Sequence, residues 1–246
     1  MTTSPRTALV TGASSGIGAA TVSRLVLLGY RVFGTSRTPG GADEVRRRGG
    51  EPVRCDVTDE SDCLRLTEIV PVCDVLICAA GGNRVMDLSL VTRDDWDFVM
   101  DLNARSLFVL NQVVGSRLRR GGAIVNVAST AAKVAVPSVA VYAAAKAAVL
   151  SMTRSFATEY AHHGVRVNAV LPKIIDTPMQ RQYLDGVAAS TGTSASELNA
   201  KRVAEIPLGR AGTADECAAA ISFLASDESS YMTGQSINVC GGWLMG

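Results

Sequence analysis

The sequence has little histidine, few aromatic residues and almost no net charge. It holds 2 histidines and 5% aromatic residues among 246 residues, and 24 Lys+Arg against 23 Asp+Glu leave a formal charge of +1. A histidine-based metal site and a Ser-His-Asp triad are therefore poor interpretations. Without a net positive field, neither nucleic acid nor an anionic membrane is expected as a partner.

Long apolar runs and paired cysteines are missing too. No stretch of 18 apolar residues occurs, so we expect no membrane span. The chain starts with a short polar segment, residues 1–6, which leaves no room for a signal peptide before the first predicted strand. The six cysteines form no CxxC pair, and we expect buried free thiols rather than disulfides. These features predict a cytoplasmic protein with no metal site.

Short apolar runs alternate with helix-like segments along almost the whole chain. We expect strands near 7–10, 30–35, 52–55, 73–78, 122–129, 165–171 and 236–240. Apolar positions at helical spacing predict helices near 16–28, 42–48, 60–70, 92–101, 103–119, 138–162 and 214–226. This alternation is typical of an α/β fold: a doubly wound, Rossmann-type domain whose seven-stranded parallel sheet has helices on both faces.

Residues 173–212 break this rhythm and contain several prolines and glycines. An insertion of about 40 residues in a compact domain is usually functional. We therefore predict one domain over residues 1–246, with a lid insertion over about 176–212. A surface decoration is the alternative.

A glycine-rich turn, TGASSGIG at residues 11–18, follows the first predicted strand. Glycines let the backbone turn tightly and let a ligand approach the peptide groups. The helix that starts there presents N–H groups and the positive end of its dipole, which suits a pyrophosphate. The spacing GxxxGxG differs from the commonest dinucleotide fingerprint, and a tight turn without a ligand is the alternative.

The same turn resembles that of the short-chain dehydrogenase/reductase family, and the resemblance spans essentially the whole chain. It is carried also by Asp56 in CDV, AAG at 79–81, Asn103, Ser129, the Tyr142/Lys146 pair, LPKIIDTPM at 171–179 and TGQSINVCGG at 233–242. The last third is similar to 3-oxoacyl-(acyl-carrier-protein) reductases and related ketoreductases. The resemblance implies a nicotinamide-dependent oxidoreductase acting on C=O and CH–OH groups.

Tyr142 and Lys146 are expected on one face of a long helix, because residues four apart are neighbours there. An ammonium beside a phenol favours the phenolate, so we expect a lowered pKa for Tyr142, suited to proton exchange with a carbonyl or alcohol oxygen. Ser129 ends the preceding strand at the spacing from the tyrosine that the family has.

The resemblance also assigns roles. Tyr142 would donate the proton in reduction, Ser129 would hydrogen-bond the substrate oxygen, and Lys146 would hold the nicotinamide ribose. Asn103 would position a water that links Lys146 to solvent, and an ordinary helix N-cap is the alternative. The further cofactor-binding residues implied are Gly12, Ser14, Ser15, Gly16, Ile17, Gly18, Ala80, Gly81, Pro172, Ile175 and Thr177, with Asp56 and Val57 at the adenine.

The end of the second predicted strand decides the choice of cofactor. A carboxylate there accepts a hydrogen bond from the free 2′-OH of NAD and repels a 2′-phosphate. Here Ser36 stands at the position where NAD-type relatives carry Asp, and Arg37 follows. A guanidinium favours a phosphate by bidentate contact, so we predict NADP(H) rather than NAD(H). An Arg37 that simply points to solvent is the alternative.

Two departures from the family pattern stand out. Cys78 and Ala79 replace asparagines whose amides commonly brace the central strands, so we expect a less rigid strand end. Lys173 replaces a glycine after Pro172, and Arg84 follows the fourth predicted strand. We expect these two cations at opposite lips of the substrate cleft, where they would meet a carboxylate or phosphate. Two solvated cations are the alternative. Apolar walls of this cleft are expected from Met179, Tyr183 and Trp243.

The motifs together predict an NADP(H)-dependent enzyme that reduces a small-molecule ketone to a secondary alcohol, or runs the reverse reaction. A 3-oxoacyl-carrier-protein reductase and an NAD-dependent sugar or polyol dehydrogenase are the alternatives within this class, since a fold does not select a substrate. A non-catalytic, cofactor-sensing binding protein is the alternative from another class. The family implies a homotetramer, or a homodimer, and the small residues around 139–152 would permit close helix packing between subunits.

Overall fold

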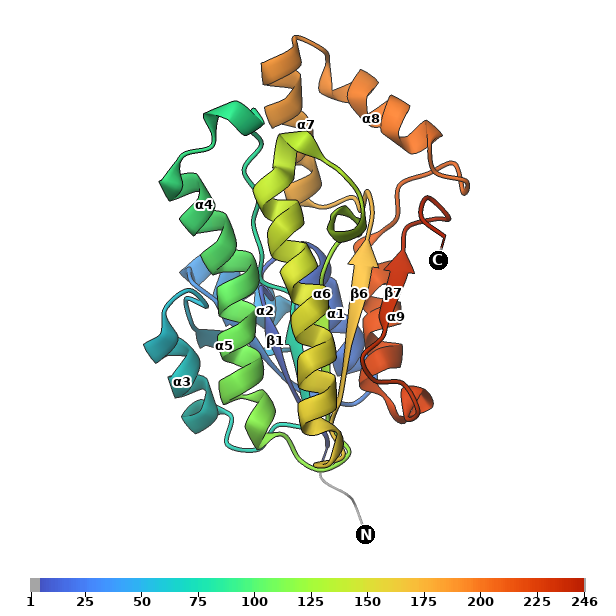
Figure 1. The fold of residues 1–246 in the computed structure, drawn as a ribbon. Helices are drawn as coiled ribbons and strands as arrows, with labels where there is room; N and C mark the ends of the chain where they lie inside the picture. The colour runs from blue at the N-terminus through green and yellow to red at the C-terminus, as the bar shows by residue number, and fades with distance from the viewer. Residues whose placement is uncertain (1–4, 246) are drawn as a thin grey trace.

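The computed structural model describes residues 5–245, and its strands form one parallel sheet (Figure 1). The strands are β1 (Thr7–Thr11), β2 (Arg31–Ser36), β3 (Glu51–Arg54), β4 (Val75–Cys78), β5 (Ala123–Val127), β6 (Arg166–Pro172) and β7 (Ser236–Val239). Within the described residues the seven strands lie in the order β3-β2-β1-β4-β5-β6-β7, and every neighbouring pair is parallel. The predicted doubly wound α/β fold is confirmed. Because the strand order reverses between β1 and β4, a crevice is expected at the carboxyl ends of these strands.

Helices cover both faces of this sheet, as predicted. They are α1 (Gly16–Leu27), α2 (Pro39–Arg47), α3 (Glu60–Ile69), α4 (Arg93–Met100), α5 (Ser106–Val113), α6 (Ala140–Ala161), α7 (Pro178–Thr191), α8 (Ala195–Ala204) and α9 (Ala214–Ala225). One buried cluster joins the sheet to α3, α5 and α6, and a second joins it to α1, α2 and α9. Figure 1 shows α4, α5 and α6 side by side in front of the sheet, with α1 and α9 behind it.

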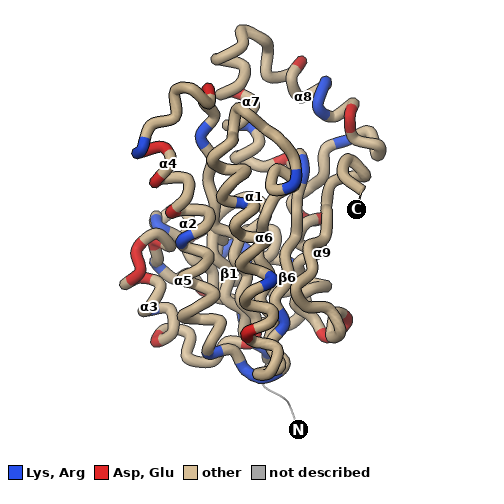
Figure 2. The backbone as a smooth tube through the Cα atoms, in the orientation of Figure 1, with Lys and Arg blue, Asp and Glu red and all other residues tan. Residues whose placement is uncertain are grey.

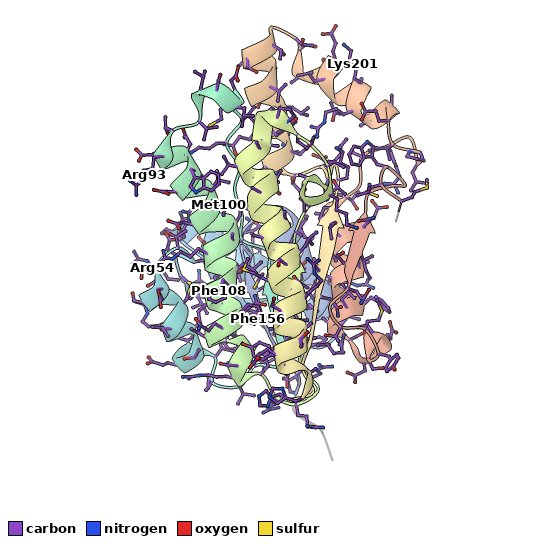
Figure 3. The ribbon with its side chains drawn as sticks, viewed as in Figure 1. Arg54, Arg93, Met100, Phe108, Phe156 and Lys201 are labelled. Atoms are coloured by element: carbon purple, nitrogen blue, oxygen red, sulfur yellow. The ribbon has the colours of Figure 1, made fainter. Side chains whose placement is uncertain are left out.

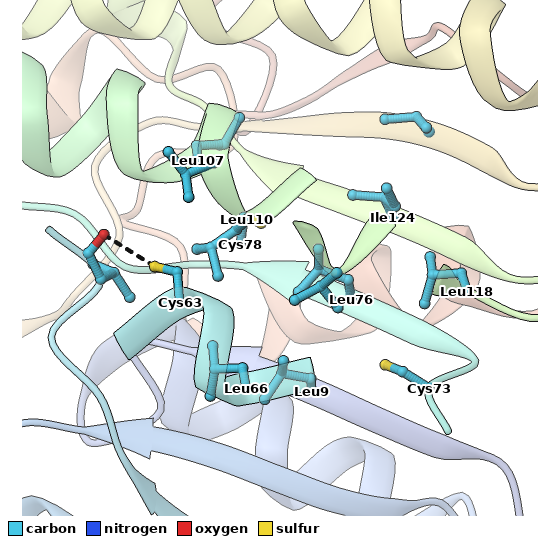
Figure 4. Close-up of a cluster of buried hydrophobic side chains, with 14 of the residues drawn as sticks. Leu9, Cys63, Leu66, Cys73, Leu76, Cys78, Leu107, Leu110, Leu118 and Ile124 are labelled. Carbon is cyan, nitrogen blue, oxygen red and sulfur yellow. Dashed lines mark hydrogen bonds between the residues drawn. The ribbon is translucent and has the colours of Figure 1, made fainter. Parts of the chain in front are cut away.

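Successive side chains of a strand belong alternately to the first and the second of these clusters. In β4, Leu76 and Cys78 belong to the first cluster, whereas Val75 and Ile77 belong to the second. Successive side chains of a strand point to opposite faces, so a strand buried on both sides must be apolar throughout. Figure 4 shows the first cluster, in which Leu76 and Cys78 lie among leucines of α3 and α5.

The six cysteines are free and buried, as predicted. Burial raises the pKa of the Cys73 thiol to about 12. Cys63 donates a hydrogen bond to the carbonyl of Val57 over 3.4 Å, the dashed line in Figure 4. These thiols therefore act as small apolar core residues.

Two regions differ from the predicted pattern. The helices expected at 92–101 and 103–119 are α4 and α5, and a π-helical segment, Asp101–Arg105, joins them end to end. The expected lid region contains two helices, α7 and α8, where no regular structure was predicted. Figure 1 shows both helices beyond the carboxyl end of the sheet. Residues 1–4 of the polar first segment lie outside the described residues.

Figure 2 shows Lys and Arg positions as well as Asp and Glu positions spread over the visible backbone. Among residues 5–245, no helix is both long and apolar enough to cross a bilayer. No group of three or more metal-ligating side chains occurs in the same range.

Candidate active site

The glycine-rich turn lies against the chain that follows β4. Gly12 has a φ of +64°, and a Cβ there would lie 2.7 Å from Cα of Ala80. A Cβ on Gly18 would lie 2.2 Å from the carbonyl oxygen of Gly12. Both positions therefore require glycine. Ser15 is the N-cap residue of α1, and its side chain makes no capping hydrogen bond. The turn thus forms a bare backbone cradle that ends at a helix N-terminus, which fits the pyrophosphate of a dinucleotide.

Thr11 braces the end of β4, where family asparagines are replaced by Cys78 and Ala79. Its hydroxyl accepts hydrogen bonds from the backbone N–H groups of Ala79 and Ala80, both over 3.2 Å. Deeper in the core, Asn111 donates to Oδ1 of Asn126 over 3.2 Å, and Asn126 donates to the hydroxyl of Thr153 over 3.0 Å. The expected loss of rigidity is therefore offset by other polar side chains.

A cavity of about 350 Å³ runs from the glycine-rich turn to helices α7 and α8. The predicted site residues that line it are Gly12, Ser14, Ser15, Gly16, Ile17, Gly18, Ser36, Arg37, Val57, Ala80, Gly81, Ser129, Tyr142, Lys146, Pro172, Lys173, Ile175, Thr177, Met179 and Tyr183. Asn103, Asp56, Arg84 and Trp243 are not among its lining residues. The fold therefore brings most of the predicted site together from segments far apart in the sequence.

Arg84 does not lie at the cleft, and the prediction that placed it there is wrong. Its guanidinium pairs with the carboxylate of Asp95 and lies 4.2 Å from the ring centroid of Phe98. These partners hold Arg84 against α4, away from the cavity. Trp243 does not line the cavity, but its ring contacts Lys173, which does.

Ser129, Tyr142 and Lys146 lie next to one another in the wall of the cavity. Ser129 follows β5 and caps a short 3-10 turn, where its hydroxyl accepts a hydrogen bond from the N–H of Ala131 over 3.2 Å. Tyr142 and Lys146 lie one turn apart on α6, with Nζ of Lys146 5.5 Å from the tyrosine ring centroid. Lys146 is only 4% exposed, and its ammonium donates to the carbonyl of Val127 over 2.9 Å.

Burial decides the proton affinities of this trio. It raises the pKa of Tyr142 to about 12, although a hydrogen bond with the Ser129 hydroxyl lowers that pKa in part. It also lowers the pKa of Lys146 to about 8, because an ammonium loses its hydration there. The predicted lowering of the Tyr142 pKa by Lys146 is wrong for the protein chain alone. Tyr142 is therefore a neutral phenol at pH 7, which is the form that donates a proton.

Asn103 lies at the centre of the π-helical segment and is 1% exposed. Its amide donates to the carbonyls of Gly82 and Val99, both over 2.8 Å, and its Oδ1 accepts from the N–H of Gly82 over 3.3 Å. The alternative interpretation as a helix N-cap is wrong. A Cβ on Gly81 would lie 2.9 Å from Oδ1 of Asn103 and 3.5 Å from Nζ of Lys146. Asn103 therefore fixes the loop beside Lys146.

Ser14, Ser36 and Arg37 lie together near the start of α2. A Cβ on Gly41 would lie 2.1 Å from Oγ of Ser36 and 2.9 Å from Cβ of Ser14. The Ser36 hydroxyl is engaged locally, because it donates to the carbonyl of Thr38 and accepts from its N–H. The Arg37 side chain is 62% exposed and lies 3.8 Å from a carboxylate oxygen of Asp56. Such an exposed pair is weak, so Arg37 is free to engage an anion in the cavity.

Asp56 turns its carboxylate towards its own loop. Oδ1 accepts hydrogen bonds from the N–H and the hydroxyl of Thr58, over 3.0 and 2.7 Å. Burial opposes ionisation, but these bonds and the Arg37 charge lower the pKa of Asp56 overall. Its neighbours Cys55 and Val57 line the cavity in its place.

The segment after β6 lines the cavity and leads into α7. The Thr177 hydroxyl caps α7 by accepting from the N–H of Gln180 over 3.3 Å, and its side chain lies beside Gly16. Lining residues that the sequence prediction missed include Asn83, Val136, Val139, Gln180 and Arg202. Two helix-start signals were available, Thr177-Pro178 and the capping box from Ser194 to Glu197. They predict α7 and α8 and place Gln180 and Arg202 on ordered elements.

Comparison with known proteins places this arrangement in a family. A family model described as enoyl-(acyl carrier protein) reductase matches residues 12–244. A protein named as a monensin polyketide synthase ketoacyl reductase, from Streptomyces virginiae, is 38% identical over 251 residues and 96% of either chain. The 3-oxoacyl-(acyl-carrier-protein) reductase of Salmonella typhimurium is 35% identical over 247 residues and 97% of either chain.

Solved structures agree. The ligand-free aldohexose dehydrogenase of Thermoplasma acidophilum superposes with a TM-score of 0.89 at 28% identity, covering 97% of this chain and 94% of that one. Levodione reductase superposes with a TM-score of 0.89 at 28% identity, covering 96% of each. The chain therefore belongs to the short-chain dehydrogenase/reductase family, and it is an oxidoreductase of C=O and CH–OH groups, as its motifs predicted.

Proposed function

We propose that this protein reduces a small-molecule ketone to a secondary alcohol with NADPH, and runs the reverse reaction with NADP⁺. The observation that carries the proposal is the Tyr142 phenol, hydrogen-bonded to Ser129 in a cavity that reaches the glycine-rich turn. A bound nicotinamide cofactor supplies the hydride, because no protein side chain does so. The cradle at Gly12 and Gly18 would hold its pyrophosphate, and Lys146 would hold its ribose.

The remaining chemistry belongs to the chain's own residues. Ser129 and Tyr142 present two hydroxyls to one carbonyl oxygen, which polarises the C=O bond and orients it. Tyr142 then donates its proton as negative charge develops on that oxygen. Asn103 acts through Gly82 and keeps the loop beside Lys146 in place, so that the buried lysine keeps its position under the tyrosine.

NADPH is the proposed cofactor because Ser36 stands where NAD-type relatives carry a carboxylate and is followed by Arg37, and because the Ser14 side chain lies close to Ser36. The carboxylate of Asp56, 3.8 Å from Arg37, would orient the guanidinium. Initial rates with NADPH and NADH test this assignment, and a clear preference for NADH contradicts it.

Reduction of a 3-oxoacyl group on a carrier protein is the second candidate, because relatives that match nearly the whole chain bear that name. Lid helices that line the cavity favour a dedicated small substrate instead. The two candidates separate in one assay. Free ketones consume NADPH in the first case, whereas only the carrier-bound 3-oxoacyl group does so efficiently in the second.

We further propose one domain over residues 1–246, with 176–212 as its lid, and a homotetramer or homodimer. On the inner side of α6, Val149 belongs to the cluster that joins the helix to the sheet, whereas Val141 and Ala145 pack with Val99 and Ala104. Its outer side leaves small residues exposed, next to the exposed ring of Phe108 on α5. Figure 3 labels Phe108 and Phe156, whose rings are 5.5 Å apart, on these two helices. Light scattering during size-exclusion chromatography tests the assembly, and a monomer contradicts it.

A further inference from the structure

Unpartnered polar atoms gather at one place in the molecule. Among residues 5–245, three buried side-chain atoms lack a hydrogen-bond partner: Oδ1 of Asn83, Nε2 of Gln180 and Nη1 of Arg202. All three residues line the cavity that holds Tyr142. Buried polar groups in native proteins are nearly always paired, so each exception needs an explanation. The two nitrogens, Nε2 of Gln180 and Nη1 of Arg202, are donors and need an acceptor, whereas Oδ1 of Asn83 needs a donor. An anionic group in this cavity would satisfy the two nitrogens.

Arg202 is the charged member of this group, and it comes from the lid. It lies on α8, and its guanidinium carbon is 4.3 Å from the ring centroid of Tyr183 on α7. Stacking on an aromatic ring fixes the plane of a guanidinium and leaves its edge for hydrogen bonds. The contact therefore ties the two lid helices together and holds the unpartnered Nη1 at the cavity wall.

Lys173 supplies a second cation in the same cavity. Its Nζ lies 3.6 Å from the ring centroid of Trp243. Burial, and then the charge of Arg202, lower the pKa of Lys173 to about 8, so the two cations are close enough to repel each other. Neither forms an ion pair within 4.0 Å in the described part of the chain, although 14 such pairs occur there. Two half-buried cations without a carboxylate partner are costly unless an anion joins them.

One acid acts on both cations from a distance. Glu205 raises the pKa of each, and it accepts a hydrogen bond from the Trp243 indole over 3.2 Å. Two positive charges and this one negative charge leave a single positive charge uncompensated. The balance favours a monoanion over a phosphate dianion.

We propose that Arg202 and Lys173 form a subsite for a substrate carboxylate, set apart from the carbonyl that Tyr142 protonates. The proposal rests on the proposed ketone reduction and names its substrate class, a keto acid. Arg202 would donate from Nη1, Lys173 would add its charge, and Gln180 would add an amide donor from α7.

A chain-length series tests this subsite. The test compares kcat/KM with NADPH for straight-chain 3-oxo to 7-oxo carboxylates and for their methyl esters. Each substrate is assayed with the native enzyme and with three variants, Arg202→Met, Lys173→Met and Lys201→Met. Lys201 is the matched control, because it is an exposed cation and the neighbour of Arg202 on α8 (Figure 3). We expect the kcat/KM of at least one carboxylate to exceed that of its ester by about tenfold or more, because hydrogen bonds to charged groups are stronger than those to neutral groups. Arg202→Met should abolish that preference through KM, whereas Lys201→Met should keep it.

The outcomes separate the subsite from the reaction. Equal rates with acids and esters overturn the subsite and leave the ketone reduction standing. A stronger preference for a phosphorylated ketone also overturns it. If the enzyme reduces neither the acids nor the esters, binding of the same carboxylates is measured by tryptophan fluorescence. The Trp96→Phe background is used for this titration, because it leaves Trp243, which contacts Lys173, as the one tryptophan that reports binding. A saturable change in fluorescence that is lost in Arg202→Met supports the subsite. No saturable change in the protein that keeps Arg202 overturns the subsite.

Discussion

Asn103 and Gly82 exchange hydrogen bonds in both directions, although they are 21 residues apart. The amide of Asn103 donates to the carbonyl of Gly82 over 2.8 Å and accepts from its N–H over 3.3 Å, so it pairs with this backbone as a neighbouring strand would. The π-helical segment around Asn103 places this amide against the loop after β4. Asn103 lies outside the cavity lining, and through Gly82 it holds in place the loop whose Gly81 lines the cavity.

Asn103→Ala removes three hydrogen bonds, two with the backbone of Gly82 and one with the Val99 carbonyl. We expect the free energy of unfolding to fall by about 2–4 kcal/mol and NADPH binding to weaken with it. Asn111→Ala is the control, because it breaks a buried amide pair whose two residues do not line the cavity. Denaturant unfolding and NADPH titration measure both effects. Equal weakening of NADPH binding in the two variants would remove Asn103 from the site.

The cradle predicts a strict requirement for glycine at position 18. In Gly18→Ala the new Cβ would meet the Gly12 carbonyl, so the turn must shift. Overpacking of this kind costs roughly 1–3 kcal/mol, and we expect NADPH binding to be lost. Gly40→Ala serves as the comparison, since a Cβ there meets nothing within 4 Å. Calorimetric titration with NADPH decides the matter, and full affinity in Gly18→Ala would exclude the turn as the pyrophosphate site.

Arg37 should determine the preference for NADPH. Arg37→Ala removes a guanidinium from the cavity wall, and we expect KM for NADPH to rise about 10- to 100-fold while KM for NADH changes little. Arg46→Ala removes an exposed arginine of α2 that pairs with Asp43, and it should leave both values unchanged. Steady-state kinetics with both cofactors provide the readout. A parallel rise for NADH would mean that Arg37 does not recognise the 2′-phosphate.

The buried ammonium of Lys146 predicts a pH-dependent stability. Its pKa is about 8 in the folded chain, against an ordinary value of 10.5, because burial disfavours the charge. Between these two values the unfolded chain binds more protons, so the folded state gains stability as the pH rises. Relative to Lys146→Met, the free energy of unfolding of the native protein should therefore rise by about 3 kcal/mol from pH 7 to 10.5. Urea unfolding across this range measures the difference, and a constant difference contradicts the buried charge.

Local signals predicted most of the fold and much of the site. The strands are short, apolar on both faces and followed by helices, so their order along the chain was readable. The glycine-rich turn, Ser129, Tyr142 and Lys146 lie at strand ends or one helical turn apart, and local spacing brings them to the same edge of the sheet.

The errors concern tertiary contacts. Arg84 follows a strand end as a cleft residue would, but pairing with Asp95 on α4 takes it elsewhere. The pKa of Tyr142 follows from burial by residues of several elements, and no local pattern records that. Arg202 was missed because α8 was not predicted, although its capping box was present.

Reduction of neutral ketones by Tyr142→Phe tests the central claim most directly, because one hydroxyl is removed and the ring remains. NADPH consumption is followed for the native enzyme, for Tyr142→Phe and for Tyr160→Phe, which loses a buried hydroxyl of the same helix that donates to the Asn111 carbonyl. We predict that Tyr142→Phe lowers kcat by about 10²- to 10⁴-fold with NADPH affinity nearly unchanged, and that Tyr160→Phe keeps its rate. A Tyr142→Phe enzyme that reduces ketones at the native rate would contradict the account.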